Sequence, residues 1–141
     1  MYNKTIKTRY ISEKEIMQGY IDNTFKPTNN MTRLEVAIAL VRFVELDYKG
    51  KKSNFKDIQG TWFEEYIAAL EEKGYIKGKP DGTFGAYDDI TRAEVCVMIN
   101  RILGRDKCDI VQFESKFSDI EFNSWYRYDV LEATCSHTFI K

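Results

Sequence analysis

The sequence predicts an all-α fold made of tandem helix-loop-helix repeats, and three observations support this prediction. Apolar residues recur at helical spacing, helix starts carry capping residues, and long motifs occur more than once. A chain of 141 residues suits one domain with a real core. We therefore expect a single domain over 1–141, packed as a pseudo-symmetric helical bundle, with units at about 1–48, 49–106 and 107–141 and a truncated third unit.

The most informative stretch runs from Gly78 to Leu103. It begins with a turn at Asp81-Gly82, since both residues tolerate turn conformations. A helix follows, with Thr91 at the N-cap and Glu94 three residues later, which is the pattern of a capping box. The expected apolar face of this helix consists of Ala93, Cys96, Val97, Ile99 and Leu103.

The same pattern occurs earlier in the chain, over residues 19–44. Thr83 follows Thr24, and Thr91 follows Thr32, at one constant offset (83 − 24 = 91 − 32 = 59). A fixed offset without gaps indicates an internal repeat. The earlier helix therefore starts at a capping box formed by Thr32 and Glu35. We expect Phe25 and Phe84 to fill the core beneath their turns.

A second repeated block contains Phe-x-Asp-Ile followed by an aromatic helix start. Residues 55–58 lead to Trp62, and residues 117–120 lead to Trp125 with one extra residue between. The first unit has no such block. Helices are expected at 3–18, after Thr32, at 62–73 with a capping box of Thr61 and Glu64, after Thr91, and from Ser124 to about Ser136, with an extended tail at 138–140.

These motifs resemble the S-layer homology (SLH) family. The second unit carries nearly all of the family pattern, in Phe55-x-Asp57, Gly74-Tyr75-Ile76-Lys77-Gly78, Asp81-Gly82-Thr83-Phe84 and Ile90-Thr91-Arg92-Ala93-Glu94. The other units depart from it. Unit one has Asn23 where Gly82 stands in unit two, and unit three ends before any Thr-Arg-Ala-Glu.

The resemblance implies a non-catalytic binding module in which three units close into a pseudo-threefold prism. It also implies that the arginine of Thr-Arg-Ala-Glu helps to bind an acidic, typically pyruvylated, secondary cell-wall polysaccharide between units. An arginine beside the free amides of a helix start suits a carboxylate or phosphate. The candidate ligand-binding residues are Arg33, Arg92, Trp62, Asp57 and Asp119. The alternative for each arginine is a salt bridge between units, to Asp57 or Asp119.

A second function from another class stays open, namely an intracellular protein-protein interaction module or small inhibitor on the SLH scaffold. The N-terminus lacks a secretory signal, and three cysteines without a Cys-x-x-Cys pair argue against a disulfide framework. The cell wall or surface is expected if a signal or fusion lies outside this sequence, and otherwise the cytoplasm. A net charge of −1 gives no reason to expect nucleic acid, and no transmembrane segment is seen.

No motif predicts an enzyme or a cofactor. The Asp81-Gly82 turn lacks the alternating acidic ligands of a calcium loop. The spacing of Cys96, Cys108, Cys135 and His137 contains no recognised pair of zinc ligands. The four lysines Lys49, Lys51, Lys52 and Lys56 suggest an anion-binding patch or, more simply, a solvated loop.

The third unit lacks its own Thr-Arg-Ala-Glu helix, so an apolar face is expected to be uncovered there. Leaving a large aromatic side chain exposed to water would lose roughly 1.5–3 kcal/mol of burial free energy. We therefore predict that residues 117–140 form an intermolecular surface, centred on Trp125, Tyr126 and Val130. The partner would be a protein target or a second copy in a homodimer.

Overall fold

The computed structural model describes residues 16–105, 115 and 117–134 of the chain. This part contains four α-helices, α2 (Arg33–Phe43), α3 (Glu64–Glu72), α4 (Arg92–Ile102) and α5 (Arg127–Thr134). Its only β-pairing is an isolated bridge between Thr32 and Asp89. The all-α prediction is therefore confirmed. The helix expected at 3–18 and the tail at 138–140 lie outside the described residues.

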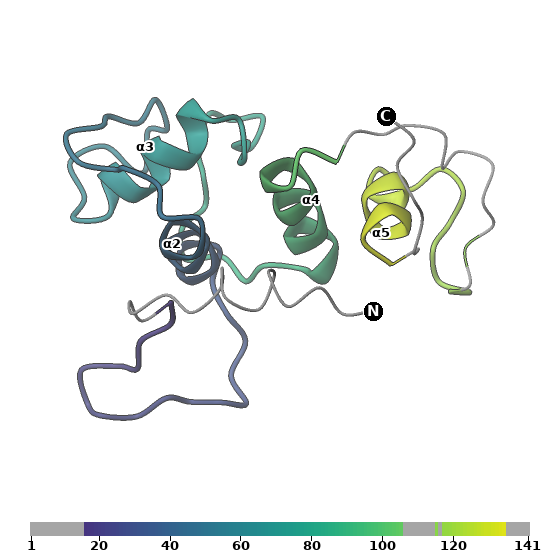
Figure 1. Cartoon of the computed structure of the whole chain (residues 1–141), viewed down its shortest axis with the longest axis horizontal. Coiled ribbons are helices and arrows are strands. Elements are labelled where there is room, and N and C mark those ends of the chain that lie inside the picture. Colours follow the sequence, from purple (N-terminus) through teal and green to yellow (C-terminus); the bar gives the residue numbers. More distant parts are fainter. Residues whose placement is uncertain (1–15, 106–114, 116, 135–141) are drawn as a thin grey trace, which may run out of the picture.

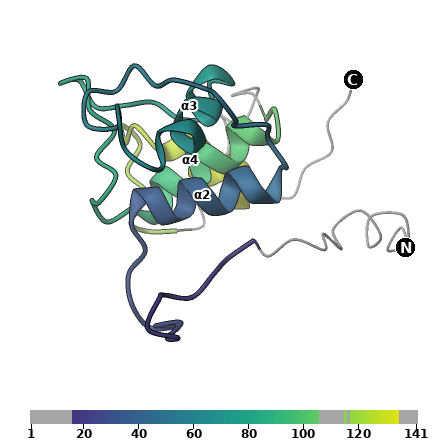
Figure 2. The same cartoon turned by 90° about the vertical axis from the view of Figure 1, so that its left-hand side faces the viewer.

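The helices pack as two pairs, α2 against α3 and α4 against α5 (Figures 1 and 2). Each pair joins the capped helix of one unit to the aromatic-block helix of the next. The third-unit helix is therefore covered by α4, and Leu131 on it is buried. The main core gathers around α2, α3 and the loop before α4, and consists of Leu34, Val36, Ala37, Val41, Ile58, Phe63, Ile67, Leu70, Ile76, Phe84, Ala86 and Met98.

Both predicted capping boxes of the repeat are confirmed. At α4 the Thr91 amide donates to the Glu94 carboxylate at 2.8 Å, and the Glu94 amide donates to the Thr91 hydroxyl at 3.3 Å. At α2 the same two bonds join Thr32 and Glu35, at 2.8 and 3.2 Å. Two amides that would otherwise lack partners are satisfied at each helix start.

The predicted capping box of Thr61 and Glu64 is wrong. The N-cap of α3 is Phe63, which makes no side-chain capping bond. Glu64 is the first helical residue, so its carboxylate turns back to accept from the amides of Gly60 at 2.9 Å and Ser53 at 3.3 Å. The helix consequently starts two residues later than the aromatic pattern predicts.

The predicted apolar face of α4 is only partly correct. Val97 is buried, but Ile99 and Leu103 are 38% and 50% exposed. The side that faces α5 instead carries Asn100, which is 1% exposed and donates to the Asp129 carbonyl at 2.9 Å. Helix α5 begins at Arg127, three residues later than predicted.

Candidate functional site

Two loops of the repeat frame the site, the unit-one loop (residues 18–29) and the unit-two loop (residues 77–88). Each is closed by an aspartate that accepts from the threonine two residues on. The Thr83 amide and hydroxyl lie 3.0 and 2.7 Å from Asp81 Oδ1, and those of Thr24 lie 3.1 and 2.7 Å from Asp22 Oδ1. These are local Asx-type turns, and the unit-two turn lies at Asp81-Gly82, where the sequence predicts a turn.

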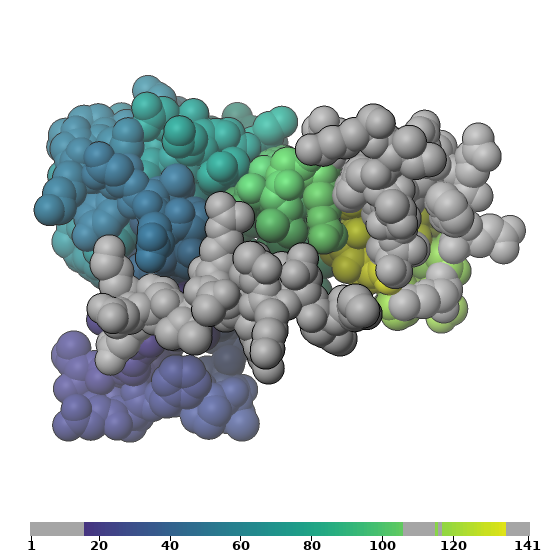
Figure 3. All heavy atoms as spheres, viewed as in Figure 1, coloured from purple at the N-terminus to yellow at the C-terminus, as the bar shows by residue number. Residues whose placement is uncertain are grey.

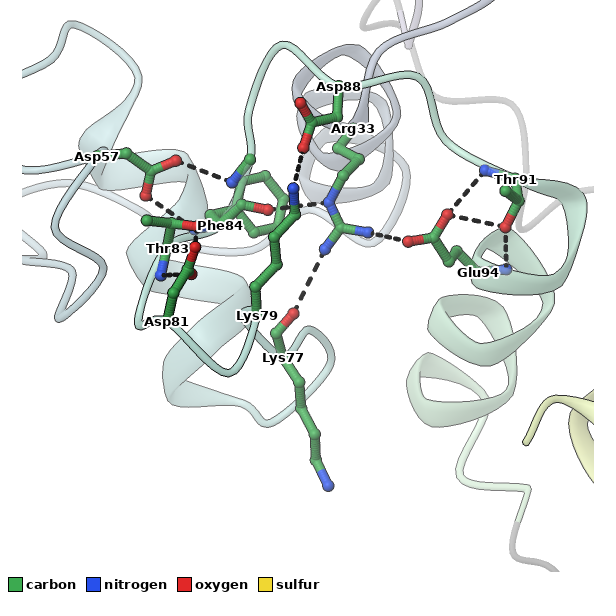
Figure 4. A network of polar contacts seen from close by, with 11 residues as sticks. Arg33, Asp57, Lys77, Lys79, Asp81, Thr83, Phe84, Asp88, Thr91 and Glu94 are labelled. Carbon is green, nitrogen blue, oxygen red and sulfur yellow. Dashed lines mark hydrogen bonds and ion pairs between the residues drawn. The ribbon is translucent and has the colours of Figure 1, made fainter.

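Asp57 holds the unit-two loop in place. Its carboxylate accepts from the amides of Phe84 and Gly85, each at 2.8 Å (Figure 4). Burial opposes ionisation of Asp57, but these amide donors outweigh it and hold the pKa of the carboxyl below its ordinary value. Phe84 is fully buried beneath the loop and stacks on Phe55, with ring centroids 5.7 Å apart.

Arg33 of α2 inserts beneath the same loop and is only 6% exposed. Its Nε donates to the Phe84 carbonyl at 3.0 Å and its Nη2 to the Lys77 carbonyl at 3.4 Å. Its Nη1 forms an ion pair with Glu94 Oε1 at 2.5 Å (Figure 4). The guanidinium also lies over the Phe84 ring, 4.8 Å from its centroid. The guanidinium is therefore engaged on all three nitrogens.

The first amides of α2 are satisfied by the same loop. The Arg33 amide donates to the Asp88 carbonyl and the Leu34 amide to the Ala86 carbonyl, both at 2.9 Å. The start of α2 thus presents guanidinium and amide donors, and unit two supplies a set of carbonyl oxygens that receives them. This is the interface that joins units one and two.

The start of α4 carries the same kinds of donor, but no acceptor among the described residues binds them. Arg92 is exposed, and within the described residues its guanidinium makes no hydrogen bond or ion pair. The same part of the chain offers no acceptor to the amides of Arg92 and Ala93. The capping box at Thr91 is nevertheless complete, so the helix start is ordered as in α2. An oxyanion would find a guanidinium and two amide donors there.

The alternative of a salt bridge between units holds for Arg33, but its partner is Glu94 and not Asp57 or Asp119. Asp57 is instead committed to loop amides, and Asp119 lies exposed in unit three. Trp62 is 73% exposed and lines a hollow under the unit-one loop. The five candidate ligand-binding residues therefore belong to several separate places, and of the two arginines only Arg92 has a side chain without a hydrogen bond or ion pair among the described residues.

Glu94 makes a second contact that the capping pattern in the sequence does not reveal. Its Oε2 serves the Thr91 cap while its Oε1 pairs with Arg33. Burial opposes its ionisation, but the Thr91 amide and hydroxyl and the Arg33 charge together hold the pKa of Glu94 below its ordinary value. In the sequence, the capping pattern already accounts for a glutamate at position 94. No neighbouring residue therefore indicates its contact with Arg33.

Two further predictions concern exposed aromatics. Phe25 does not fill the core, because it is 55% exposed while its counterpart Phe84 is buried. Trp125 is 63% exposed and meets the half-buried Tyr126 edge to face, with centroids 5.4 Å apart, and Val130 is half-buried. The role of these last three residues in partner binding stays a prediction.

The lysine patch has mostly internal partners. Lys51 pairs with Glu72, Lys52 with Glu64, and Lys56 donates to the Asp81 carbonyl. Within residues 16–105, 115 and 117–134, no cluster of His, Cys, Asp and Glu could hold a metal ion. Cys108, Cys135 and His137 lie outside those residues. None of the helices described here has the length and apolar character required to span a bilayer.

Comparison with known proteins shows which family the chain belongs to. The model of the S-layer homology domain matches residues 9–37 and 54–96. The chain belongs to the S-layer homology domain family. The matched SLH segments contain both capped helix starts and the loop that Arg33 fills, so the resemblance inferred from the motifs is confirmed.

Three relatives of the chain are surface or anchoring proteins by name. The chain is 38% identical over 136 residues to a cellulosome-anchoring protein of Acetivibrio thermocellus, covering 93% of this chain and 30% of that protein. It is 33% identical over 144 residues to cell surface glycoprotein 1 of the same organism (94% and 6%). It is 31% identical over 117 residues to the S-layer protein sap of Bacillus anthracis (82% and 14%). The chain therefore spans less than a third of each of these relatives.

Proposed function

We propose that the chain is a non-catalytic module that anchors to the cell surface by binding an anionic secondary cell-wall polysaccharide. Its relatives are a cellulosome-anchoring protein, a cell surface glycoprotein and S-layer proteins, which supports a place at the surface. The ligand is proposed to be a pyruvylated polymer, because its acidic substituent offers carboxylate oxygens to a guanidinium.

The observation that carries this proposal is the contrast between Arg33 and Arg92. At α2 the guanidinium and the first two amides bind acceptors from unit two. At α4 the same donors face solvent within the described residues. A carboxylate can receive two parallel bonds from a guanidinium, and the positive end of the helix dipole favours a negative charge. Trp62, which is 73% exposed, supplies a flat apolar face of the kind on which sugar rings pack.

A pull-down with purified wall polymer tests the proposal. We expect the chain to bind the native polymer and to lose at least tenfold in affinity for a polymer stripped of its acidic substituents, since about 1.4 kcal/mol corresponds to tenfold. Arg92→Ala should weaken binding by a similar factor. Arg101→Ala, which removes one positive charge from the last turn of the same helix, is the control. Equal binding by Arg92→Ala and the parent chain would contradict the proposal.

A second candidate function is protein binding at the same place. The contacts of Arg33 favour protein binding, because the guanidinium at the start of α2 donates to backbone carbonyls of a protein loop. A partner protein that presents a loop like residues 77–88 would satisfy the donors of α4 equally well. The stripped-polymer experiment separates the two candidates, because a protein partner would not respond to the acidic substituents of the wall.

A further inference from the structure

Two exposed aromatic side chains lie against one buried ring at the boundary between units one and two. Trp62 and Tyr87 are each 73% exposed, whereas Phe63 is 2% exposed. The rings of Trp62 and Phe63 meet edge to face with centroids 5.3 Å apart, and those of Phe63 and Tyr87 do so at 5.9 Å. Both exposed rings therefore share one buried support, although they come from different parts of unit two.

Tyr87 lies on a segment whose main chain is fixed on both sides. The carbonyls of its neighbours Ala86 and Asp88 accept from the amides of Leu34 and Arg33, both at 2.9 Å. These bonds join the segment to the start of α2. An aromatic side chain has few rotatable bonds, and on a fixed main chain it loses little freedom when a ligand packs on it. The exposed ring of Tyr87 is thus prepared for contact with a ligand.

Polar side chains border the two rings. Thr32 and Asp89 form an isolated antiparallel bridge, and beside it Asn30 Nδ2 donates to Asp89 Oδ2 at 3.2 Å. The side chains of Asn30 and Asp89 are both exposed. The unit-one loop projects from the body that α2 and α3 build (Figure 3), and Asn30 and Trp62 line the hollow beneath it. Amide and carboxylate groups at this border can exchange hydrogen bonds with hydroxyl groups.

The charges next to Tyr87 disfavour an acidic ligand there. Lys79 forms an ion pair with the carboxylate of Asp88 (Figure 4), and the guanidinium of Arg33 is enclosed beneath the unit-two loop. Asp89, two positions after Tyr87, has an exposed carboxylate. A carboxylate placed on the Tyr87 ring would therefore meet a negative charge, whose repulsion an uncharged ligand avoids.

We propose that Trp62 and Tyr87 together bind uncharged sugar rings of the wall polymer. This role rests on the proposed function and adds to it the class of sugar that is bound at the boundary between units one and two. The negative face of an aromatic ring attracts the C–H groups on the apolar face of a pyranose. The hydroxyls of the sugar then bond to the Asn30 amide and the Asp89 carboxylate.

The size of the patch favours a sugar over a protein partner. Two aromatic side chains bordered by polar and charged groups match a small ring that has one apolar face and a rim of hydroxyls. A stable protein interface buries roughly 1,200–2,000 Å² in total, which is far more than two side chains supply. One polymer chain carries both acidic and uncharged groups, so Arg92 and the aromatic pair can contribute to the same binding event.

Polymer stripped of its acidic substituents tests the proposal, because it offers no carboxylate to Arg92. We expect the parent chain to bind this polymer weakly, and Tyr87→Ala to raise the dissociation constant about three- to tenfold. Tyr87→Phe keeps the ring and should bind like the parent. Phe122→Ala is the matched control, since Phe122 is 72% exposed in unit three. Thermal midpoints of the three variants should stay near that of the parent, because the altered side chains are exposed.

The fluorescence of Trp62 reports on the same place directly. The chain has two tryptophans, so Trp125→Phe leaves Trp62 as the single indole. Stripped polymer should shift the emission of Trp62 to shorter wavelength and protect it from quenching by acrylamide. Adding Tyr87→Ala to this variant should raise the polymer concentration needed for both effects.

Three results would overturn the proposal. They are a parent chain that does not bind stripped polymer, a Tyr87→Ala chain that binds it as well as the parent, and binding that leaves the emission of Trp62 unchanged. The proposed function fails in a different way, when native polymer is bound no more tightly than stripped polymer or when Arg92→Ala binds native polymer like the parent. In that case the stripped polymer would still decide the role of Tyr87.

Discussion

Arg33 and Glu94, one from each Thr-Arg-x-Glu helix, form an ion pair across the unit boundary with 2.5 Å between Nη1 and Oε1. Glu94 uses its other carboxylate oxygen to cap its own helix at Thr91. One carboxylate thus connects the start of α4 to the start of α2. The repeat therefore links its units through the same residues that begin its helices.

The capping bonds lead to a first prediction. Thr91→Ala should lower the free energy of unfolding by about 1 kcal/mol, because it removes the acceptor for the Glu94 amide. Thr91→Ser keeps the hydroxyl and should recover most of the loss. Chemical denaturation of the two variants measures the difference. Equal stability of Thr91→Ala and the parent chain would mean that the cap contributes nothing.

The two loop phenylalanines give a matched pair. Phe84→Ala should destabilise the fold by about 3–5 kcal/mol, because a fully buried ring is replaced by a cavity. Phe25→Ala should cost much less, because Phe25 is 55% exposed. Denaturation curves of both variants test this order. Similar losses at the two positions would show that Phe25 is buried in solution.

Acid should destabilise the interface between units. The folded-state pKa of Glu94 lies below its ordinary value of 4.5, so its stabilising contribution is present above pH 4.5 and is lost as pH falls through the folded pKa. We expect the thermal midpoint to drop as the pH is lowered below about 4.5. Glu94→Gln keeps a capping side chain but loses the charge, so its midpoint should be lower near neutrality and fall less in acid.

Glu45→Gln is the control for this acid experiment, since Glu45 is exposed and outside the network. Its midpoint should follow that of the parent chain at each pH. If Glu94→Gln and the parent chain lost the same stability on acidification, the ion pair with Arg33 would not be a source of the pH dependence.

The parts of the fold that the sequence predicts are those with local signals. Thr91 and Glu94 are three residues apart, so their capping box is visible in the sequence and is confirmed. The partner of Arg33 is not visible, because Glu94 lies 61 positions away and its capping role already accounts for it. The predicted start of α3 is too early, because Thr61 and Glu64 also fit the capping pattern although they do not form it.

Burial was less predictable than secondary structure. Phe25 and Phe84 occupy equivalent places in the repeat, and equivalence suggests equal burial. Phe84 lies against Phe55 and Asp57 beneath its loop, and among the described residues Phe25 has no such neighbours. Likewise, the sequence gives Arg33 and Arg92 the same place after an N-cap. The position of the unit-two loop is what distinguishes them, since it encloses Arg33, whereas Arg92 is exposed among the described residues.

The most direct test of the account compares Arg33→Ala with Arg92→Ala in two measurements, thermal unfolding and binding to acidic wall polymer. Arg33→Ala should lower the free energy of unfolding by roughly 3 kcal/mol or more, because it leaves Glu94 and loop carbonyls without their donor. Arg92→Ala should unfold like the parent chain and lose at least tenfold in affinity for the polymer. If Arg92→Ala bound the polymer normally, or if its loss of binding merely followed a loss of stability, the division of roles between the two arginines would be wrong.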